Sequence, residues 1–387
     1  MKMISPDYKG GSIVNLMSSV YNALGQKNPY PNLRILRKDE IKECKNVVLI
    51  VLDGLGFNQL KRQGEKTALL KHLSGRMTSV WPATTAAAVT TFYTGLAPRQ
   101  HAVTGWYMQV KELGMQIIPL TFMSRFERMP LSDNEGKLAS EIFSSRSKPP
   151  NLNRPVFAVC PKEFKSSVYN SYFSQWMSLS LYHDLPTFFG NIEKLVKKRG
   201  KKYVYAYWPG YDKHCHEFGA DAKKTKSHLR KIDAGFRKLL KSIEGTDTMI
   251  IVTADHGLVD VKKKDKIIAN DVKRLGECLS MPLAGETRMH FAYVKPSKIK
   301  QFKSVFKKEL KGRHSLFRSE DLVKRGFFGL FESHDKLLDR LGDYVMIAHE
   351  GQGMVEDLAI KKEHSHIGHH GGVSEDEMYV PLIVVRK

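Results

Sequence analysis

Cysteine is scarce in this sequence. The chain has four cysteines among 387 residues, at positions 44, 160, 215 and 278. They show no CxxC spacing, and four are too few to hold a chain of this length together by disulfides. The sequence therefore does not resemble the small disulfide-rich secreted domains, and we expect a reducing, cytoplasmic location.

Long apolar runs are missing as well. No uncharged apolar stretch reaches the roughly 20 residues that cross a bilayer, and residues 1–25 lack the apolar centre of a signal peptide. The chain also contains no internal repeat and no low-complexity tract. We therefore expect a soluble protein without a membrane partner, long enough for one large domain or two moderate ones.

Acidic residues are outnumbered by basic ones. There are 40 Asp and Glu against 62 Lys and Arg, which gives a net charge of +22. Such a chain attracts nucleic acid, an anionic membrane surface or a small phosphorylated molecule. The lysine-rich runs at 197–202, 262–266 and 307–313 are separated and carry no interleaved aromatic residues. They are more typical of solvated surface, so nucleic-acid binding stays an alternative that is not favoured.

Apolar, β-branched runs predict strands that are buried on both faces. They cover residues 46–54, 155–161, 203–212, 248–257 and 379–387. Helical stretches such as 227–244 lie between them, and this alternation predicts an α/β fold with helices on both faces of a sheet. Between 281 and 348 a more charged strand, helix, strand pattern indicates a small α+β insertion. We predict a catalytic core of residues 1–280 plus 349–387 and a small α+β cap of residues 281–348.

Side chains that can bind a divalent cation follow several of these strands. The candidates are Asp53, Asp212, His216, Asp255 and His256, with one or more of His364, His366, His369 and His370 in the segment HSHIGHHGG. Ligands collect at the carboxyl ends of parallel strands. Each residue alone is more often a helix cap or a surface side chain. Together, carboxylates and imidazoles are the ligand set of zinc, manganese or iron rather than of calcium.

Two of these candidates have helical spacing. Asp212 and His216 are four residues apart, so their side chains face the same way if the segment is a helical turn. Asp255 and His256 are adjacent at the end of a predicted strand, where neighbouring positions could bind one ion. The spacing therefore supports a metal site without proving one.

The run TTAAAVTTFYTG is compatible with a helix that begins at Thr84 or Thr85. Free N–H groups and the helix dipole at such an N-terminus favour an anionic phosphoryl group. Threonines there ordinarily cap or pack the helix. Beside a metal cluster, however, a hydroxyl at this point would accept a phosphoryl group, and we favour that interpretation.

Five motifs, in this order, resemble the alkaline phosphatase superfamily and, within it, the nucleotide pyrophosphatase/phosphodiesterase family. They are LIVLDGLG, VWPATTAAAVTTFYTGLAPRQHAV, YDKHCHEFG, VTADHGLVD and GHHGGVSEDEMYVPLIV. The ordered set is highly specific, although no single motif is. The resemblance implies an alkaline-phosphatase-like sheet sandwiched by helices, with an insertion similar to the small cap of bacterial and archaeal members. That cap covers the site and supplies no metal ligand.

The resemblance also implies a site with two divalent metal ions, most commonly zinc, with manganese as the alternative. Asp53, Asp255 and His256 resemble the ligands of the ion that also holds the nucleophile. Asp212, His216 and His370 resemble the ligands of the other ion. All six ligand positions of the family are filled in this chain.

Thr85 matches the nucleophile of the family, which lies three residues beyond the proline of the motif and also bridges the metals. Thr84 is the alternative if the register slips by one residue. The resemblance implies hydrolysis of phosphodiester or pyrophosphate bonds in small, anionic, nucleotide-like substrates through a phosphothreonine intermediate. Eukaryotic members carry an asparagine three residues past the nucleophile that donates to the phosphoryl group. Ala88 stands there in this chain, so the backbone N–H of Thr85 or another residue must replace that donor.

Two other functions stay open on the sequence. A phosphomonoesterase of the same superfamily would share the metal ligands and differ only in the pocket around the phosphoryl group. A basic nucleic-acid-binding protein on a decayed hydrolase fold would show gaps in the ligand set, and the sequence shows none. Basic residues around the mouth of the site would attract an anionic substrate, and Arg99, Lys213 and Arg288 are the candidates.

Overall fold

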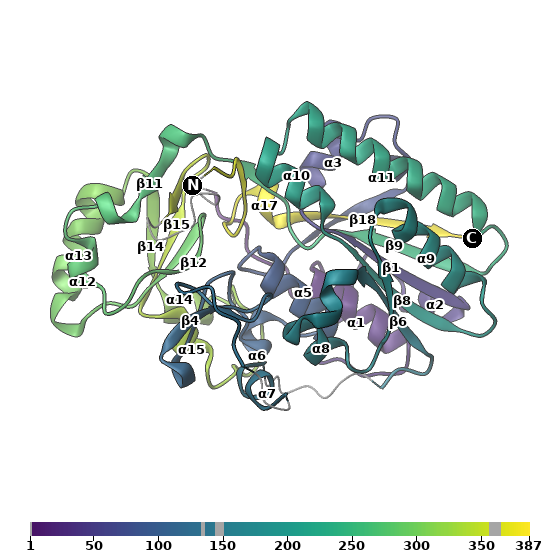
Figure 1. Ribbon diagram of the computed structural model, residues 1–387, viewed down its shortest axis with the longest axis horizontal. Helices are drawn as coiled ribbons and strands as arrows, with labels where there is room; N and C mark the ends of the chain where they lie inside the picture. Colours follow the sequence, from purple (N-terminus) through teal and green to yellow (C-terminus); the bar gives the residue numbers. More distant parts are fainter. Residues whose placement is uncertain (1, 133–135, 144–150, 356–364) are drawn as a thin grey trace.

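A seven-stranded sheet forms the centre of the computed structural model, which describes residues 2–132, 136–143, 151–355 and 365–387 (Figure 1). The strand order is β2 (Leu73–Thr78), β18 (Tyr379–Arg386), β9 (Thr248–Thr253), β1 (Asn46–Leu52), β8 (Lys202–Trp208), β6 (Val156–Pro161) and β7 (Ser178–Tyr182). The five strands from β9 to β7 run parallel. Strand β18 is antiparallel to both of its neighbours, β2 and β9.

Helices cover both faces of this sheet. Every residue of β1, β8 and β9 is buried, as expected for apolar, β-branched strands covered on both sides. Helices α1 (Ile13–Ala23), α5 (Thr85–Thr94) and α8 (Val168–Ser174) lie on one side, and α9 (Leu185–Lys197) and α11 (Lys223–Ser242) on the other (Figure 1). The predicted α/β sheet sandwiched by helices is confirmed.

Helix α11 shows why these segments pack as they do. Its buried residues include Leu229, Ile232, Phe236 and Leu239, spaced three or four apart, so they form one apolar stripe that faces the core. The helix begins four residues earlier than the predicted 227, because the lysine-rich segment before that point also favours a helix.

The register of the central strands brings their carboxyl ends to one level. Leu52 of β1 pairs with Trp208 of β8, and Val51 pairs with Thr253 of β9. The chain therefore leaves all three strands at the same edge of the sheet. Strand β8 ends at Trp208, before the predicted 212, because helix α10 (Gly210–Phe218) begins there.

A second, four-stranded sheet lies beside the first, at the left of Figure 1. Its order is β12 (Ala284–Glu286), β13 (Met289–Ala292), β15 (Tyr344–Ala348) and β14 (His314–Arg318). Phe302 of α13 (Ile299–Val305) packs in one apolar cluster with Met346, and Phe291 packs in another that includes Trp81. The second cluster joins this sheet to the segment that leads into α5. The division of the chain at 281 and 348 stays a prediction.

Shorter elements complete the described part of the chain. The helices are α2 (Lys38–Glu43), α3 (Phe57–Gln63), α4 (Ala68–Lys71), α6 (Pro98–His101), α7 (Lys137–Phe143), α12 (Leu275–Cys278), α14 (Ser319–Lys324), α15 (Leu337–Leu341) and α17 (Glu375–Met378). The strands are β3 (Met108–Val110), β4 (Met115–Ile118), β5 (Met123–Ser124), β10 (Val259–Asp260), β11 (Lys266–Ile268), β16 (Gly353–Val355) and β17 (Gly368–His369). Among the described residues, no helix is both long enough and apolar enough to cross a membrane.

Candidate active site

Three buried candidates gather where β1 and β9 end. Asp53 follows β1, Asp255 and His256 follow β9, and one ligand atom from each lies within 4.8 Å of the others. Oδ1 of Asp255 accepts hydrogen bonds from the backbone N–H groups of Gly54 and His256, each at 3.0 Å. The turns after the two strands therefore hold each other in place, and we call these three residues the first group.

Asp212, His216 and His370 form a second group with the same close spacing of ligand atoms. Asp212 and His216 share a face of α10, as their spacing predicts, and His216 Nε2 lies 3.1 Å from Asp212 Oδ2. The other ring nitrogen of His216, Nδ1, is 2.7 Å from the carbonyl oxygen of Gly368, which fixes the ring. The ring of His370 stacks on that of His256 with centroids 3.9 Å apart, so the two groups adjoin.

His366 and His369, the other described histidines of HSHIGHHGG, belong to neither group. His369 Nε2 is 3.1 Å from the carbonyl oxygen of His366, and His369 lies in β17 opposite Val259. Both His366 and His369 line the cavity beside the second group. His364 lies outside the described residues.

Thr85 is the first residue of α5, and its hydroxyl reaches the first group. Oγ1 of Thr85 lies 3.1 Å from His256 Nε2, and the side chain is half-buried and lines the cavity. Thr84 is the N-cap residue and is fully buried, and its hydroxyl donates to Oε1 of Glu286 instead of capping the helix. The hydroxyl of Thr85 is thus the one that faces both the cavity and the first group.

Ala88 cannot supply the missing phosphoryl donor. Its side chain is buried in the apolar core, and its N–H donates to the carbonyl oxygen of Thr84 at 3.0 Å. The N–H groups at the beginning of α5 have no acceptor within the helix, as at any helix N-terminus. N–H groups at a helix N-terminus can donate to an anionic ligand, here one beside Thr85.

Both groups fit a divalent cation. Four buried atoms in them lack a hydrogen-bond partner: Asp53 Oδ1, Asp212 Oδ1, Asp255 Oδ2 and His370 Nδ1. Burial, with the neighbouring Asp255 and Asp212, raises the pKa of Asp53 well above its usual value. The site therefore gathers more negative charge than its own residues neutralise. A cation would partner the orphaned atoms and offset this charge, and the Asp/His donor set suits zinc or manganese.

Asp212 and His216, which pair on α10, shift each other's pKa in opposite directions. Burial opposes ionisation of both side chains. The carboxylate of Asp212 outweighs this effect and raises the pKa of His216, while His216 lowers the pKa of Asp212. Burial and His256 lower the pKa of His370 well below its usual value, so its imidazole is neutral and has a lone pair for a metal.

A cavity of about 210 Å³ opens beside these groups. It is lined by Thr85, Trp106, Tyr107, Asp212, His216, Glu286, Thr287, His366, His369 and His370. None of the three predicted basic residues is among them. Arg288 is buried and paired with Glu377, and Arg99 binds Ser333 and backbone carbonyls of 323 and 329, so the prediction for these two was wrong. Lys213 is exposed on α10, away from the cavity lining.

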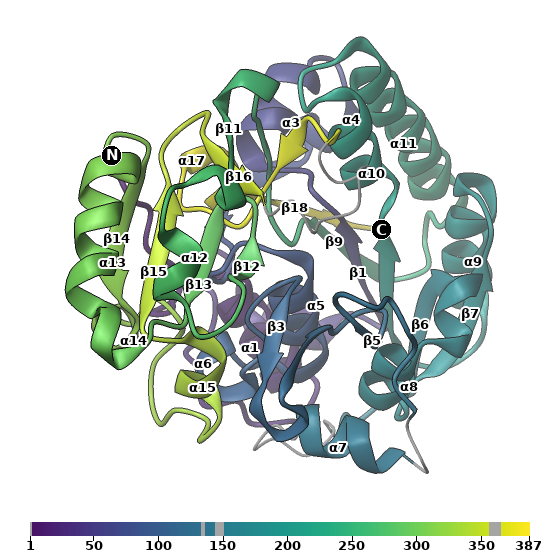
Figure 2. The ribbon, with the colours of Figure 1, turned by 60° about the vertical axis from the view of Figure 1, so that its left-hand side comes forward.

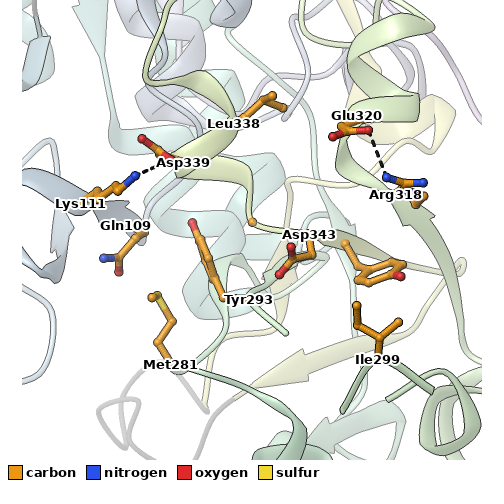
Figure 3. Close-up of a pocket in the computed structure, with 12 residues that line it drawn as sticks. Gln109, Lys111, Met281, Tyr293, Ile299, Arg318, Glu320, Leu338, Asp339 and Asp343 are labelled. Atoms are coloured by element: carbon orange, nitrogen blue, oxygen red, sulfur yellow. Dashed lines mark hydrogen bonds and ion pairs between the residues drawn. The ribbon is translucent and has the colours of Figure 1, made fainter. Parts of the chain in front are cut away.

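A larger cavity, of about 580 Å³, lies on the second sheet and contains no residue of either group (Figure 3). Tyr293, Asp343 and Tyr344 line it. Two ion pairs also line it, Lys111 with Asp339 at 3.3 Å and Arg318 with Glu320 at 3.1 Å. Since these four charged side chains form ion pairs and Asp343 accepts a hydrogen bond from the backbone N–H of Val294 at 2.7 Å, we assign no chemistry to the cavity.

Three residues near the site escaped the sequence analysis. Tyr207, inside β8, donates its hydroxyl hydrogen to Asp53 Oδ2. Glu286 reaches the cavity from β12, and Trp106 lies on the segment that pairs with this strand. An aromatic residue in an apolar strand gives no signal beyond core packing, and a lone Glu gives none beyond surface charge.

The fold and the two Asp/His groups agree with the expected resemblance to the alkaline phosphatase superfamily. The sequence matches the model of the type I phosphodiesterase/nucleotide pyrophosphatase family over residues 47–373. The chain belongs to this family, which confirms the predicted resemblance and identifies a phosphoester hydrolase. No curated protein matches this sequence.

Solved structures share the fold at low sequence identity. Murine ectonucleotide pyrophosphatase/phosphodiesterase 5 is 17% identical, with a TM-score of 0.63 over 87% of each chain. An inactive threonine-to-alanine variant of that protein in complex with AMP is 18% identical, with a TM-score of 0.61 and the same coverage. Phosphonoacetate hydrolase from Sinorhizobium meliloti 1021, in complex with phosphonoformate, is 17% identical, with a TM-score of 0.58 over 87% of this chain and 89% of that one.

Proposed function

We propose that this protein hydrolyses phosphodiester or pyrophosphate bonds of nucleotide-like substrates through a phosphothreonine formed on Thr85. The observation that carries the proposal is the position of the Thr85 hydroxyl, 3.1 Å from His256 Nε2 and at the edge of the cavity. Family membership supports the reaction class. The AMP and phosphonoformate complexes of the structural relatives support a small phosphorylated ligand.

Two divalent metal ions complete the proposed site. Asp53, Asp255 and His256 would hold one ion, and Asp212, His216 and His370 the other. When bound, such ions lower the pKa of a hydroxyl and offset charge on the phosphoryl group. The orphaned carboxylate oxygens support this assignment, and zinc is the ion that we favour.

The chain's own residues perform the two transfers. Thr85 Oγ1 forms a bond to phosphorus as the bond to the leaving oxygen breaks, and the leaving group departs with the hydroxyl proton. The first N–H groups of α5 donate to the phosphoryl oxygens, which replaces the side-chain donor absent at Ala88. Water then cleaves the phosphothreonine, which restores the Thr85 hydroxyl and releases the phosphorylated product.

Initial rates on an aryl phosphodiester and the matching aryl phosphomonoester, with zinc or manganese supplied, test this proposal. We expect faster diester hydrolysis by the native protein and loss of detectable turnover in Thr85→Ala. Thr84→Ala is the matched control and should retain measurable turnover, because Thr84 does not line the cavity. Mass spectrometry of a quenched reaction should locate a phosphate on Thr85.

The outcomes separate the candidate functions. A preference for the monoester would move the assignment to a phosphatase. Equal turnover by Thr85→Ala and the native protein would refute Thr85 as the nucleophile. Salt-sensitive binding of DNA without any ester hydrolysis would support the nucleic-acid-binding alternative instead.

The proposal includes a cytoplasmic location. All four cysteines are buried and free, which suits a reducing compartment. Cell fractionation tests this part, and recovery of the protein in a secreted fraction would contradict it.

A further inference from the structure

Glu286 places a carboxylate in the cavity beside the nucleophile. Among the described residues that line this cavity, two are carboxylates, Asp212 and Glu286, several are imidazoles, and none is a lysine or an arginine. Asp212 belongs to a candidate metal group, whereas Glu286 belongs to neither group. Its carboxylate therefore lies next to whatever occupies the cavity.

Strand β12 holds Glu286 in this position. Backbone hydrogen bonds join Gly285 and Tyr107 in both directions, at 2.8 and 3.2 Å. They bring β12 against the segment that precedes β3, and Gly105 lies so close that a Cβ there would be 3.2 Å from Gly285 Cα. The second sheet is thus fastened to the main body at the point where Glu286 points toward α5.

The side chain itself is fixed on two sides. Oε1 of Glu286 accepts a hydrogen bond from the backbone N–H of Trp106 at 2.7 Å and another from the hydroxyl of Thr84, the neighbour of Thr85. On the opposite side a Cβ at Gly371, which follows His370, would lie 2.8 Å from Glu286 Cβ. The carboxylate is therefore held between the nucleophile segment and the loop of the second candidate metal group.

We propose that the negative charge of Glu286 selects substrates by the charge that they carry. It favours a phosphodiester monoanion over a phosphomonoester dianion. This inference rests on the proposed function, because it concerns substrates that react at Thr85. A monoester carries a second negative charge on an oxygen where a diester carries an uncharged ester group. Like charges a few ångströms apart in a partly buried site repel strongly enough to change relative rates by at least about tenfold.

Glu286→Gln isolates the charge from the structural role. The amide oxygen of glutamine can still accept from Trp106 and Thr84, while the negative charge is lost. We expect the ratio of kcat/KM for the aryl diester to that for the matching monoester to fall by about tenfold or more, mainly because the monoester reacts faster. Glu320→Gln, which neutralises an exposed carboxylate on α14, is the matched control and should leave the ratio unchanged.

A binding measurement that needs no turnover complements the rates. In the Thr85→Ala background, calorimetry gives the Kd of phenyl phosphate, and Glu286→Gln should lower it by about tenfold. Glu286→Ala is a second variant that also removes the charge, so it should lower the Kd of phenyl phosphate as well. It replaces Glu286→Gln in both measurements if Glu286→Gln does not fold.

The failure of this inference differs from the failure of the proposed function. If the native protein prefers the diester, yet Glu286→Gln alters neither the ratio nor the Kd of phenyl phosphate, the charge of Glu286 does not select the substrate and the proposed function stands. If the native protein hydrolyses neither ester, the proposed function fails. The calorimetry then still decides whether Glu286 repels the dianion.

Discussion

Replacing Arg288 with methionine should destabilise the protein strongly. Arg288 precedes β13 and is 1% exposed, and its Nε and Nη2 donate to the two carboxylate oxygens of Glu377, each at 3.0 Å. Burial opposes ionisation of Glu377, but Arg288 and nearby donors outweigh it, so the pKa of this carboxyl lies below its usual value. Removal of one partner leaves the other charge buried, which costs about 3–5 kcal/mol.

The same change should weaken the candidate metal site. Glu377 also accepts hydrogen bonds from the N–H of Gly372 at 2.9 Å and from the hydroxyl of Ser374 at 2.6 Å. These bonds fix the loop that follows His370. If Glu377 becomes protonated or moves when Arg288 is absent, this loop loses its anchor, and we expect lower zinc affinity as well as lower stability.

Urea unfolding followed by tryptophan fluorescence measures the first effect. We expect the free energy of unfolding of Arg288→Met to fall by about 3–5 kcal/mol, with the slope against urea unchanged. The double variant Arg288→Met/Glu377→Leu should recover a large part of this loss, since no unpaired charge stays buried. A loss below about 1 kcal/mol for Arg288→Met would refute the reasoning, because even an average point mutation costs that much.

Three further predictions concern the metals and pH. Tyr207→Phe removes the hydroxyl that donates to Asp53, so zinc affinity measured by competition with a chelator should fall about 10- to 100-fold; an unchanged affinity would contradict this orienting role. Prolonged chelation should abolish hydrolysis and lower the melting temperature, and added zinc or manganese should restore both; full activity after chelation would argue against the metals. Burial lowers the pKa of His314 to about 3, so only the unfolded chain takes up this proton between about pH 6.5 and 3. Stability should therefore fall by about 1.4 kcal/mol per pH unit below 6.5 from this residue alone, and His314→Leu should flatten the urea-measured profile.

The sequence predicts those parts of the fold and site that depend on local pattern. Strands β1 and β9 are apolar runs that are followed within two residues by an Asp, so their carboxyl ends and the residues that follow can be recognised without a structure. The helical spacing of Asp212 and His216 likewise predicts that they share a face, and the structure agrees.

The rest depends on contacts between distant segments. Glu286 meets the hydroxyl of Thr84 across 202 positions of sequence, and Arg288 finds Glu377 across 89. No periodic pattern in the sequence predicts either contact. Glu286 therefore cannot be recognised from the sequence, and Arg288, predicted at the mouth of the site, is instead paired with Glu377 in the interior.

The place of β18 in the sheet has a consequence for biosynthesis. Tyr379–Arg386 is synthesised after both β2 and β9, yet it pairs with both of them inside the sheet. A nascent chain that lacks these residues exposes two unpaired strand edges, which are sites of aggregation. Until translation reaches this strand, we expect these two edges to need protection by a chaperone or by another part of the chain.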